Sequence, residues 1–202
     1  RLFAILIGLS LPGLAGSAGF SEQNLVTDLG LPGVKQDADL KNPWGISFGS
    51  NTLFWISDNG TGVSTFYRGN GDKVGRVVVP SATTDPLSTP TGTVFNQSSV
   101  NFQHDVFLFA TEQGTIAGWP GGADTTASIR VNNAGSAVYK GVAMNGDRIY
   151  ASNFKTGQID VFAGPNYAPP SPPLSGSFTD PNLPAGYAPF NVQDIGGSLY
   201  VT

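Results

Sequence analysis

Short apolar segments alternate with polar, glycine-rich turns along most of the chain. Between residues 42 and 67, one apolar run follows Pro43-Trp44-Gly45, a second spans 53–57 and a third spans 63–67. The stretches between them are rich in Gly, Asn and Asp, which favour tight turns because they tolerate positive φ angles. Apolar runs of about five residues bounded by such turns predict β-strands. This region therefore predicts three consecutive short strands.

The unit recurs twice in weaker form, and a fourth copy is cut off by the end of the chain. The copies align on Gly45, Gly92, Gly141 and Asn191, which are 47, 49 and 50 residues apart. The second strand is expected at Phe54–Asp58, Leu108–Glu112, Ile149–Asn153 and Leu199–Thr202. The third is expected at Gly62–Tyr67, Gly114–Trp119 and Gly157–Phe162. A fourth is expected at Val74–Val79, Ala127–Val131 and Ser175–Phe178.

Four short strands in each repeat predict an all-β fold, namely a β-propeller of four-stranded blades. One such sheet cannot bury both of its faces alone, whereas radial stacking against similar sheets buries both. We expect blades near residues 42–80, 90–132, 139–180 and 187–202. The chain is then an N-terminal fragment that stops within the fourth blade. The alternative is a β-sandwich in which the periodicity is accidental.

The N-terminal segment, residues 1–19, has the pattern of a partial signal peptide. Arg1 is followed by an apolar run at 2–11, a Pro-Gly break and the small residues of 14–19. The apolar run is too short to span a bilayer. A buried N-terminal helix is the alternative. We expect cleavage near Ala18, a secreted, extracellular or cell-surface protein, and no transmembrane helix in the mature fragment. A lone strand at Asn24–Asp28 should follow, unpaired or with an unusual partner.

Composition narrows the classes of function. The net charge is −4 at pH 7 and no cluster of basic residues occurs, which argues against a nucleic-acid partner. The chain has no cysteine, so it cannot form a zinc–thiolate site, a disulfide or a thiol nucleophile. His104 is the only histidine, so a metal site of several histidines is excluded for this sequence, and a surface position at the edge of a blade is expected.

Polar residues follow the second strand of each repeat. They are Asp58 and Asn59, Glu112 and Gln113, and Asn153 and Lys155. Equivalent positions in successive blades lie at the same end of a ring, so these side chains are candidates for a ligand-binding site. Asp, Glu and Asn oxygens also suit Ca²⁺, with Asp58, Glu112 and Asn153 as the candidate ligands. The alternative is turn chemistry, because Asp-Asn-Gly forms tight turns whatever the function.

The aromatic residues allow two interpretations. Trp44, Trp55 and Trp119, together with Phe66, Tyr67, Tyr150 and Phe162, could form a surface on which a carbohydrate stacks. Their recurrence at matched strand positions favours a place in the core instead. Trp44 should pack between blades, and Trp119 should be partly exposed because a Pro-Gly-Gly turn follows it.

Two resemblances support this reading. Pro43-Trp44-Gly45-Ile46, followed by the segments 54–60 and 62–66, resembles a blade of an NHL-type propeller. The segments 25–29, 42–46, 154–157, 178–181 and 187–192 resemble an uncharacterised family of exported bacterial propeller proteins. The resemblance implies a propeller of about six blades and, in some members, a C-terminal PEP-CTERM sorting segment. It implies fold and location rather than an activity.

The sequence therefore favours a secreted or cell-surface binding or scaffolding module, with an extracellular protein or a glycan as its partner. The rival hypothesis is a Ca²⁺-dependent propeller hydrolase, similar to lactonases and esterases, with an ion at the centre of the ring. A structural protein of the extracellular matrix is a third hypothesis. A hydrolase needs carboxylates and amides from several blades around one ion. A binding module needs an exposed aromatic or polar patch.

Overall fold

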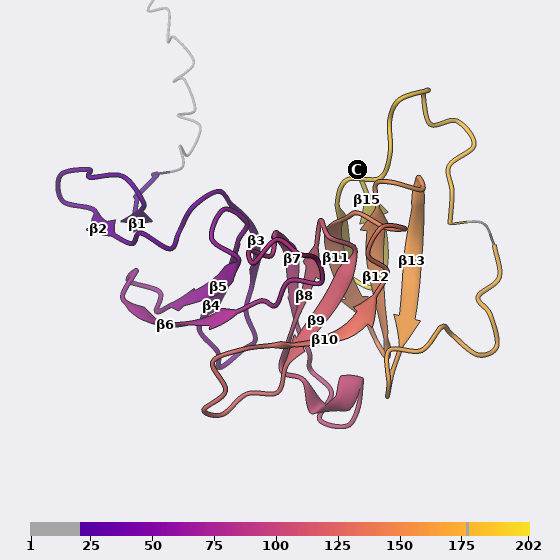
Figure 1. Cartoon of the computed structure of the whole chain (residues 1–202), viewed down its shortest axis with the longest axis horizontal. Coiled ribbons are helices and arrows are strands. Elements are labelled where there is room, and N and C mark those ends of the chain that lie inside the picture. Colours follow the sequence, from indigo (N-terminus) through magenta and orange to yellow (C-terminus); the bar gives the residue numbers. More distant parts are fainter. Residues whose placement is uncertain (1–20, 177) are drawn as a thin grey trace, which may run out of the picture.

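The computed structural model describes residues 21–176 and 178–202, which form an all-β protein (Figure 1). The predicted signal segment, residues 1–19, lies outside the described residues. Antiparallel sheets follow one another along the chain as the blades of a propeller, and each blade is a simple up-and-down meander. In the described part of the chain, no helix is long and apolar enough to cross a membrane.

The first two blades each have the four predicted strands. Blade 1 contains β3 (Pro43–Ser47), β4 (Phe54–Asp58), β5 (Val63–Tyr67) and β6 (Lys73–Val78). Blade 2 contains β7 (Pro90–Phe95), β8 (Phe107–Thr111), β9 (Thr115–Trp119) and β10 (Ser128–Asn132). A 3₁₀ turn, η1 (Phe102–His104), precedes β8. In both blades the fourth strand lies within one residue of its predicted bounds.

The third and fourth blades have fewer strands. Blade 3 contains β11 (Tyr139–Asn145), β12 (Arg148–Asn153) and β13 (Gln158–Ala163), and blade 4 contains β14 (Val192–Ile195) and β15 (Ser198–Val201). The fourth strand predicted at Ser175–Phe178 is wrong for the described residues of that range, which form bends. Phe178 nevertheless accepts a backbone hydrogen bond of 3.2 Å from Ile159 N–H, so this segment touches the edge of β13 where a fourth strand would pair.

The segment before blade 1 is tied to that blade by charged groups. β1 (Val26–Thr27) pairs in parallel with β2 (Lys35–Gln36), an unusual partner for the strand predicted at Asn24–Asp28. Asp37 is buried, and its carboxylate accepts hydrogen bonds from the Tyr67 hydroxyl at 2.5 Å and the Lys73 ammonium at 2.7 Å. The N-terminal segment is therefore fixed against the outer half of blade 1.

One register differs from the alignment of the repeats. The inner strands pair Pro43 with Asp58, Pro90 with Thr111, and Tyr139 with Asn153. Thr111, rather than Glu112, is thus the equivalent of Asp58 and Asn153. The alignment of β8 was wrong by one residue because the apolar run 106–110 has no polar position to mark its phase. A slip of one residue moves every side chain to the opposite face of a strand.

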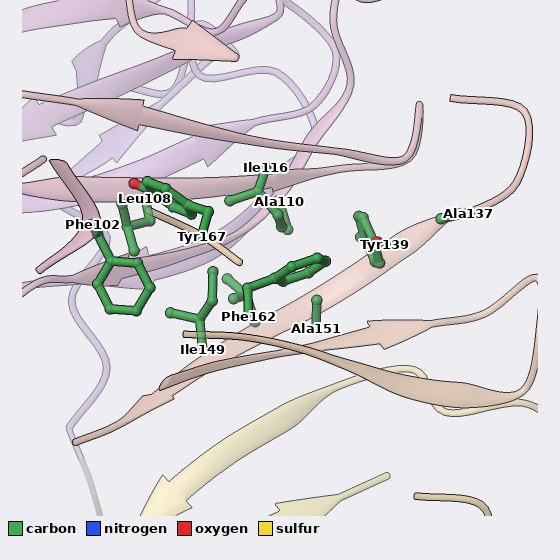
Figure 2. Close-up of a cluster of buried hydrophobic side chains, with 11 residues drawn as sticks. Phe102, Leu108, Ala110, Ile116, Ala137, Tyr139, Ile149, Ala151, Phe162 and Tyr167 are labelled. Carbon is green, nitrogen blue, oxygen red and sulfur yellow. The ribbon is translucent and has the colours of Figure 1, made fainter. Parts of the chain in front are cut away.

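The hydrophobic core lies between neighbouring blades, and alternate residues of β8 serve different interfaces. Phe107 and Phe109 pack with Trp55 toward blade 1. Leu108 and Ala110 belong to the cluster shared with blade 3. Figure 2 shows Leu108, Ala110 and Ile116 of blade 2 facing Tyr139, Ile149 and Phe162 of blade 3. Both faces of the sheet are therefore buried, as radial stacking requires.

The aligned glycines mark the points where inner strands approach most closely. A Cβ atom on Gly45 would lie 2.5 Å from the Thr91 carbonyl oxygen, and one on Gly92 would lie 2.6 Å from the Val142 nitrogen. A Cβ on Gly141 would overlap Asn191 in the same way. Each inner strand thus presents a bare backbone to the next blade, which explains why the repeats align on glycine.

Replacement of Gly92 by Ala should push β7 and β11 apart. The added methyl group meets backbone atoms, which cannot rotate away, so the free energy of unfolding should fall by roughly 1–3 kcal/mol. Urea unfolding followed by tryptophan fluorescence measures the change. Gly30→Ala is the control, because a Cβ there meets nothing within 4 Å. Equal stability of the two variants would contradict the role of the glycine.

Candidate functional site

The residues that follow the second strands of three blades occupy equivalent places. The backbone N–H groups of Asn59, Glu112 and Phe154 each donate to a carbonyl just before the inner strand of the same blade. The acceptors are Asn42 at 3.2 Å, Thr89 at 3.0 Å and Val138 at 2.9 Å. Because the three bonds are equivalent, these residues emerge at the same end of the propeller.

Polar side chains connect three blades at this end. The Asn42 amide donates to Asn59 Oδ1 at 3.1 Å, and the Asn59 amide donates to Glu112 Oε2 at 3.0 Å. Glu112 Oε1 accepts from the ammonium group of Lys140, which lies on β11. Asn42 and Asn59 belong to blade 1, Glu112 follows a strand of blade 2, and Lys140 belongs to blade 3. The result is one continuous hydrogen-bonded chain across the blades.

Three aromatic rings surround the ammonium group of Lys140. Its Nζ atom is 4.9 Å from the centre of the Trp44 ring, 5.6 Å from that of Phe154 and 5.8 Å from that of Phe190. Trp44 and Phe190 stack with centroids 5.5 Å apart, and Phe154 meets Phe190 edge-on at 6.3 Å. A cation over aromatic faces is attracted by the negative charge of the ring faces.

We call this group the ring-end site; it comprises Asn42, Trp44, Asn59, Glu112, Lys140, Phe154 and Phe190. A hollow of about 290 Å³ adjoins it, lined in part by Trp44, Thr91, Lys140 and Phe190. These four residues directly precede the aligned glycines or Asn191, so they occupy the same register position in four blades. Phe154 and Phe190 are exposed, whereas Lys140 and Glu112 are half-buried.

Glu112 is held in its ionised form. Burial alone would raise the pKa of Glu112, but the hydrogen bonds from Lys140 and Asn59 and the positive charge of Lys140 outweigh burial. The pKa of Glu112 therefore lies below its ordinary value. At neutral pH the site contains one negative and one positive group in contact, and its net charge is zero.

Two predicted site residues serve their own blades instead. Asp58 is fully buried, and its Oδ2 atom accepts bonds from the Thr65 N–H at 3.1 Å and hydroxyl at 2.7 Å. The buried Asn153 donates to Asp160 at 3.0 Å and accepts from Val138 N–H at 3.2 Å. Each residue therefore links its second strand to the third, and Asn153 also holds the segment before the inner strand. The turn after Asp58 has its positive φ angle at Gly62 and not at Asn59 or Gly60, so the tight turn predicted from Asp-Asn-Gly is not confirmed.

The remaining two candidates fasten loops. The Gln113 amide donates to the Ser81 hydroxyl at 3.1 Å and to the Leu87 carbonyl at 2.9 Å, which holds the connection between blades 1 and 2. The exposed Lys155 donates to the Gly135 carbonyl. Of the six predicted site residues, Asn59 and Glu112 are therefore brought together in the ring-end site.

The candidate calcium ligands point to separate partners. Asp58 binds Thr65, Glu112 binds Lys140 and Asn59, and Asn153 binds Asp160. Residues 21–176 and 178–202 contain no group of three or more His, Cys, Asp or Glu side chains that could hold a metal ion. A calcium site at Asp58, Glu112 and Asn153 stays a prediction, and the geometry of these residues offers it no support.

Most aromatic residues lie in the core, as their recurrence indicated. Trp55, Tyr67, Tyr150 and Phe162 are buried. Trp119 is half-buried and donates its indole N–H to the Asp124 carbonyl at 2.7 Å. Trp44 is half-buried and stacks with Phe190 of blade 4 at the ring-end site. It belongs to none of the core clusters between neighbouring blades, so its predicted place there is not confirmed. His104 is exposed at the opposite end of blade 2.

Four residues of the ring-end site were not predicted from the sequence, namely Asn42, Lys140, Phe154 and Phe190. A signal was present, because Lys140 and Phe190 precede the aligned repeat position just as Trp44 precedes Gly45. A comparison of the residues at this position in the four repeats would have selected Trp44, Lys140 and Phe190. Phe154 was hidden by the register error in blade 2, which matched Glu112 with Asn153 instead.

Two uncharacterized viral proteins are similar to the chain in sequence. The chain is 33% identical over 178 residues to an uncharacterized protein of Acanthamoeba polyphaga mimivirus, covering 82% of this chain and 44% of that protein. A second uncharacterized protein of the same virus is 30% identical over 190 residues, covering 88% and 50%. The chain thus spans about half the length of these relatives. No protein-family model matches it.

Two solved structures are similar in fold. A catalytically inactive variant of virginiamycin B lyase from Staphylococcus aureus, solved with quinupristin, has a TM-score of 0.56 at 13% identity. That match covers 79% of this chain and 48% of the lyase. A streptogramin B lyase has a TM-score of 0.52 at 15% identity, covering 81% and 49%. The protein is therefore a β-propeller by fold. The sequence relatives are viral, so membership in an exported bacterial family stays a prediction.

Replacement of Asp58 by Asn should change how stability depends on pH. Burial is the main cause that raises the pKa of Asp58 to about 7, the Thr65 bonds oppose it, and the charges of Asp37 and Asp39 add to it. Folding then favours the protonated form, so the free energy of unfolding should decrease as the pH rises from about 4 to about 7. The Asn variant should lack this decrease.

Urea unfolding at a series of pH values measures this effect as the difference between variant and wild type. Asp85→Asn removes an exposed carboxylate and is the control, which should keep the wild-type profile. An unchanged profile in Asp58→Asn would show that the buried carboxylate is ionised throughout this range.

Replacement of Lys140 by Met should raise the pKa of Glu112, because burial remains while the ammonium group is lost. The chain has two glutamates, Glu22 and Glu112, so ¹³C NMR of the side-chain carboxylates can follow both during a pH titration. Glu22 is exposed and is the internal control. If the Glu112 signal titrated as in the wild type, the ion pair with Lys140 would not exist in solution.

Proposed function

We propose that this β-propeller is a non-catalytic binding module and that the ring-end site is its ligand-binding surface. The observation that carries the proposal is the convergence of polar and aromatic side chains from four blades at one end. Phe154 and Phe190 expose their rings to solvent there, beside a hollow and a hydrogen-bonded polar chain. Exposed aromatic groups with nearby polar groups are typical of recognition surfaces.

Binding is favoured over catalysis by the state of Glu112. A general acid or base works best when its pKa is near the working pH. The low pKa of Glu112, held by Lys140 and Asn59, makes this carboxylate a weak base and a fixed acceptor. Such a group suits the orientation of a ligand. Asp58 has a pKa near neutrality, but it is fully buried within blade 1 and does not reach the site.

An extracellular location fits the same proposal. The segment 1–19 has the pattern of a signal peptide, and an extracellular protein or glycan is the expected partner. The two lyases of similar fold are named for streptogramin antibiotics. At 13% and 15% identity, these two structures support the fold of this chain but indicate nothing about its ligand.

Protein-observed NMR with a fragment library tests the proposal. The library contains neutral sugars, amino acids, short peptides and aromatic acids. The 202-residue chain has three tryptophans, so three indole N–H signals are expected, and Trp44→Phe identifies the one from the site. We expect one class of fragment to shift the Trp44 signal and to lose at least tenfold in affinity for Phe190→Ala.

Phe48→Ala is the matched control, since Phe48 is an exposed phenylalanine beyond the opposite end of β3. It should bind fragments as the wild type does. If no fragment moved the Trp44 signal, or if both variants lost affinity equally, the ring-end site would not be a binding surface.

A further inference from the structure

We propose that the ring-end site recognises an uncharged pyranose unit of a glycan. This inference rests on the proposed function and names the class of ligand for the same site. It is drawn from three properties of the site: exposed aromatic faces, adjacent donors and acceptors that are not fully used, and a net charge of zero.

The aromatic faces supply the apolar half of the site. Phe190 is 45% exposed and Phe154 is 41% exposed, although each is large enough to favour burial. Trp44 stacks with Phe190, with ring centroids 5.5 Å apart and planes inclined by 24°. One face of a pyranose ring carries C–H groups, which make dispersion contacts with a flat aromatic surface. A pyranose therefore covers the exposed ring without leaving its own polar groups in an apolar pocket.

The polar chain supplies partners for hydroxyl groups. The contacts within the site use one amide hydrogen of Asn59, one proton of Lys140 and one lone pair on each Glu112 oxygen. An amide carries two donors, an ammonium three, and each carboxylate oxygen two lone pairs. Unused hydrogen-bond donors therefore remain on Asn59 and Lys140, next to unused acceptor lone pairs on Glu112. A hydroxyl is both donor and acceptor, so adjacent sugar hydroxyls match such a pattern.

The charges at the site select an uncharged ligand. Lys140 and Glu112 neutralise each other, and each is partly withdrawn from water. An anionic ligand that reached the remaining protons of the ammonium group would lie next to the Glu112 carboxylate, which repels it. A cationic ligand would meet Lys140, which already lies among the three rings. The net charge of −4 on the chain disfavours acidic glycans further.

A matched pair of sugars tests the inference. Methyl β-D-glucopyranoside and methyl β-D-galactopyranoside are titrated against the 202-residue chain, each beside its uronic-acid counterpart, with the Trp44 indole signal as the readout. We expect the neutral sugars to bind at least tenfold more tightly than the acids. Phe190→Ala should weaken the neutral sugars at least tenfold, and Phe48→Ala should not.

Glu112→Gln gives a second test that depends on charge rather than on shape. It retains the hydrogen-bonding side chain but leaves Lys140 without its counter-ion. The preference should then shift toward the uronic acids by at least tenfold relative to wild type. The wild-type pattern of indole signals would show that the variant is folded.

The outcomes separate this inference from the broader proposal. Binding of other fragments at Trp44 without neutral sugars would overturn the glycan inference and leave the binding module. Tighter binding of uronic acids by the wild type would overturn the selection for an uncharged ligand. If nothing moved the Trp44 signal, both proposals would fall.

Discussion

The close approach of backbone to backbone between neighbouring inner strands is the constraint on which the structure depends. At Gly45, Gly92 and Gly141 a side chain would collide with the next blade. This contact fixes the position of each blade relative to the next along the direction of the inner strands. Once that phase is fixed, alternate residues of the second strands fall on opposite faces and fill the interfaces on both sides. The same phase places Asn59, Glu112 and Phe154 at one end of the ring.

The fold was predictable from the sequence because its determinants are periodic and local. Glycine at the inner strand, apolar runs and polar turns recur at similar spacing, and stacking of sheets explains all three. The failures occurred where local signals are weak. Apolar residues fill β8, so its register was read one residue away from the observed one. In blade 3 the fourth strand was predicted at 175–178, which reads Ser-Gly-Ser-Phe and lies between Pro173 and Pro181. Glycine is depleted in strands, and the flanking prolines cannot donate backbone hydrogen bonds that would extend a ladder.

The candidate site was predictable only in part, because a shift of one residue at the end of a strand decides whether a side chain reaches the site. Asn59 and Glu112 were selected because polar residues at strand ends meet at one end of a propeller. Asp58 and Asn153 were selected by the same rule, but each lies one residue earlier and points into its own blade. Lys140 could not be distinguished from a solvent-exposed lysine by residue type alone. Its place among three aromatic rings depends on side chains that come from blades 1, 3 and 4.

The residues of the ring-end site come from equivalent positions in successive blades. Each blade has two such positions: the residue before the inner-strand glycine and the residue after the second strand. Trp44 and Asn59 fill them in blade 1, Thr91 and Glu112 in blade 2, and Lys140 and Phe154 in blade 3. In blades 1 and 3 the residues at these two positions do not belong to the hydrophobic core, so other side chains can replace them without repacking the blades. The backbone at these positions thus repeats from blade to blade while the side chains differ, so the chemistry of this end of the propeller is set separately from its fold.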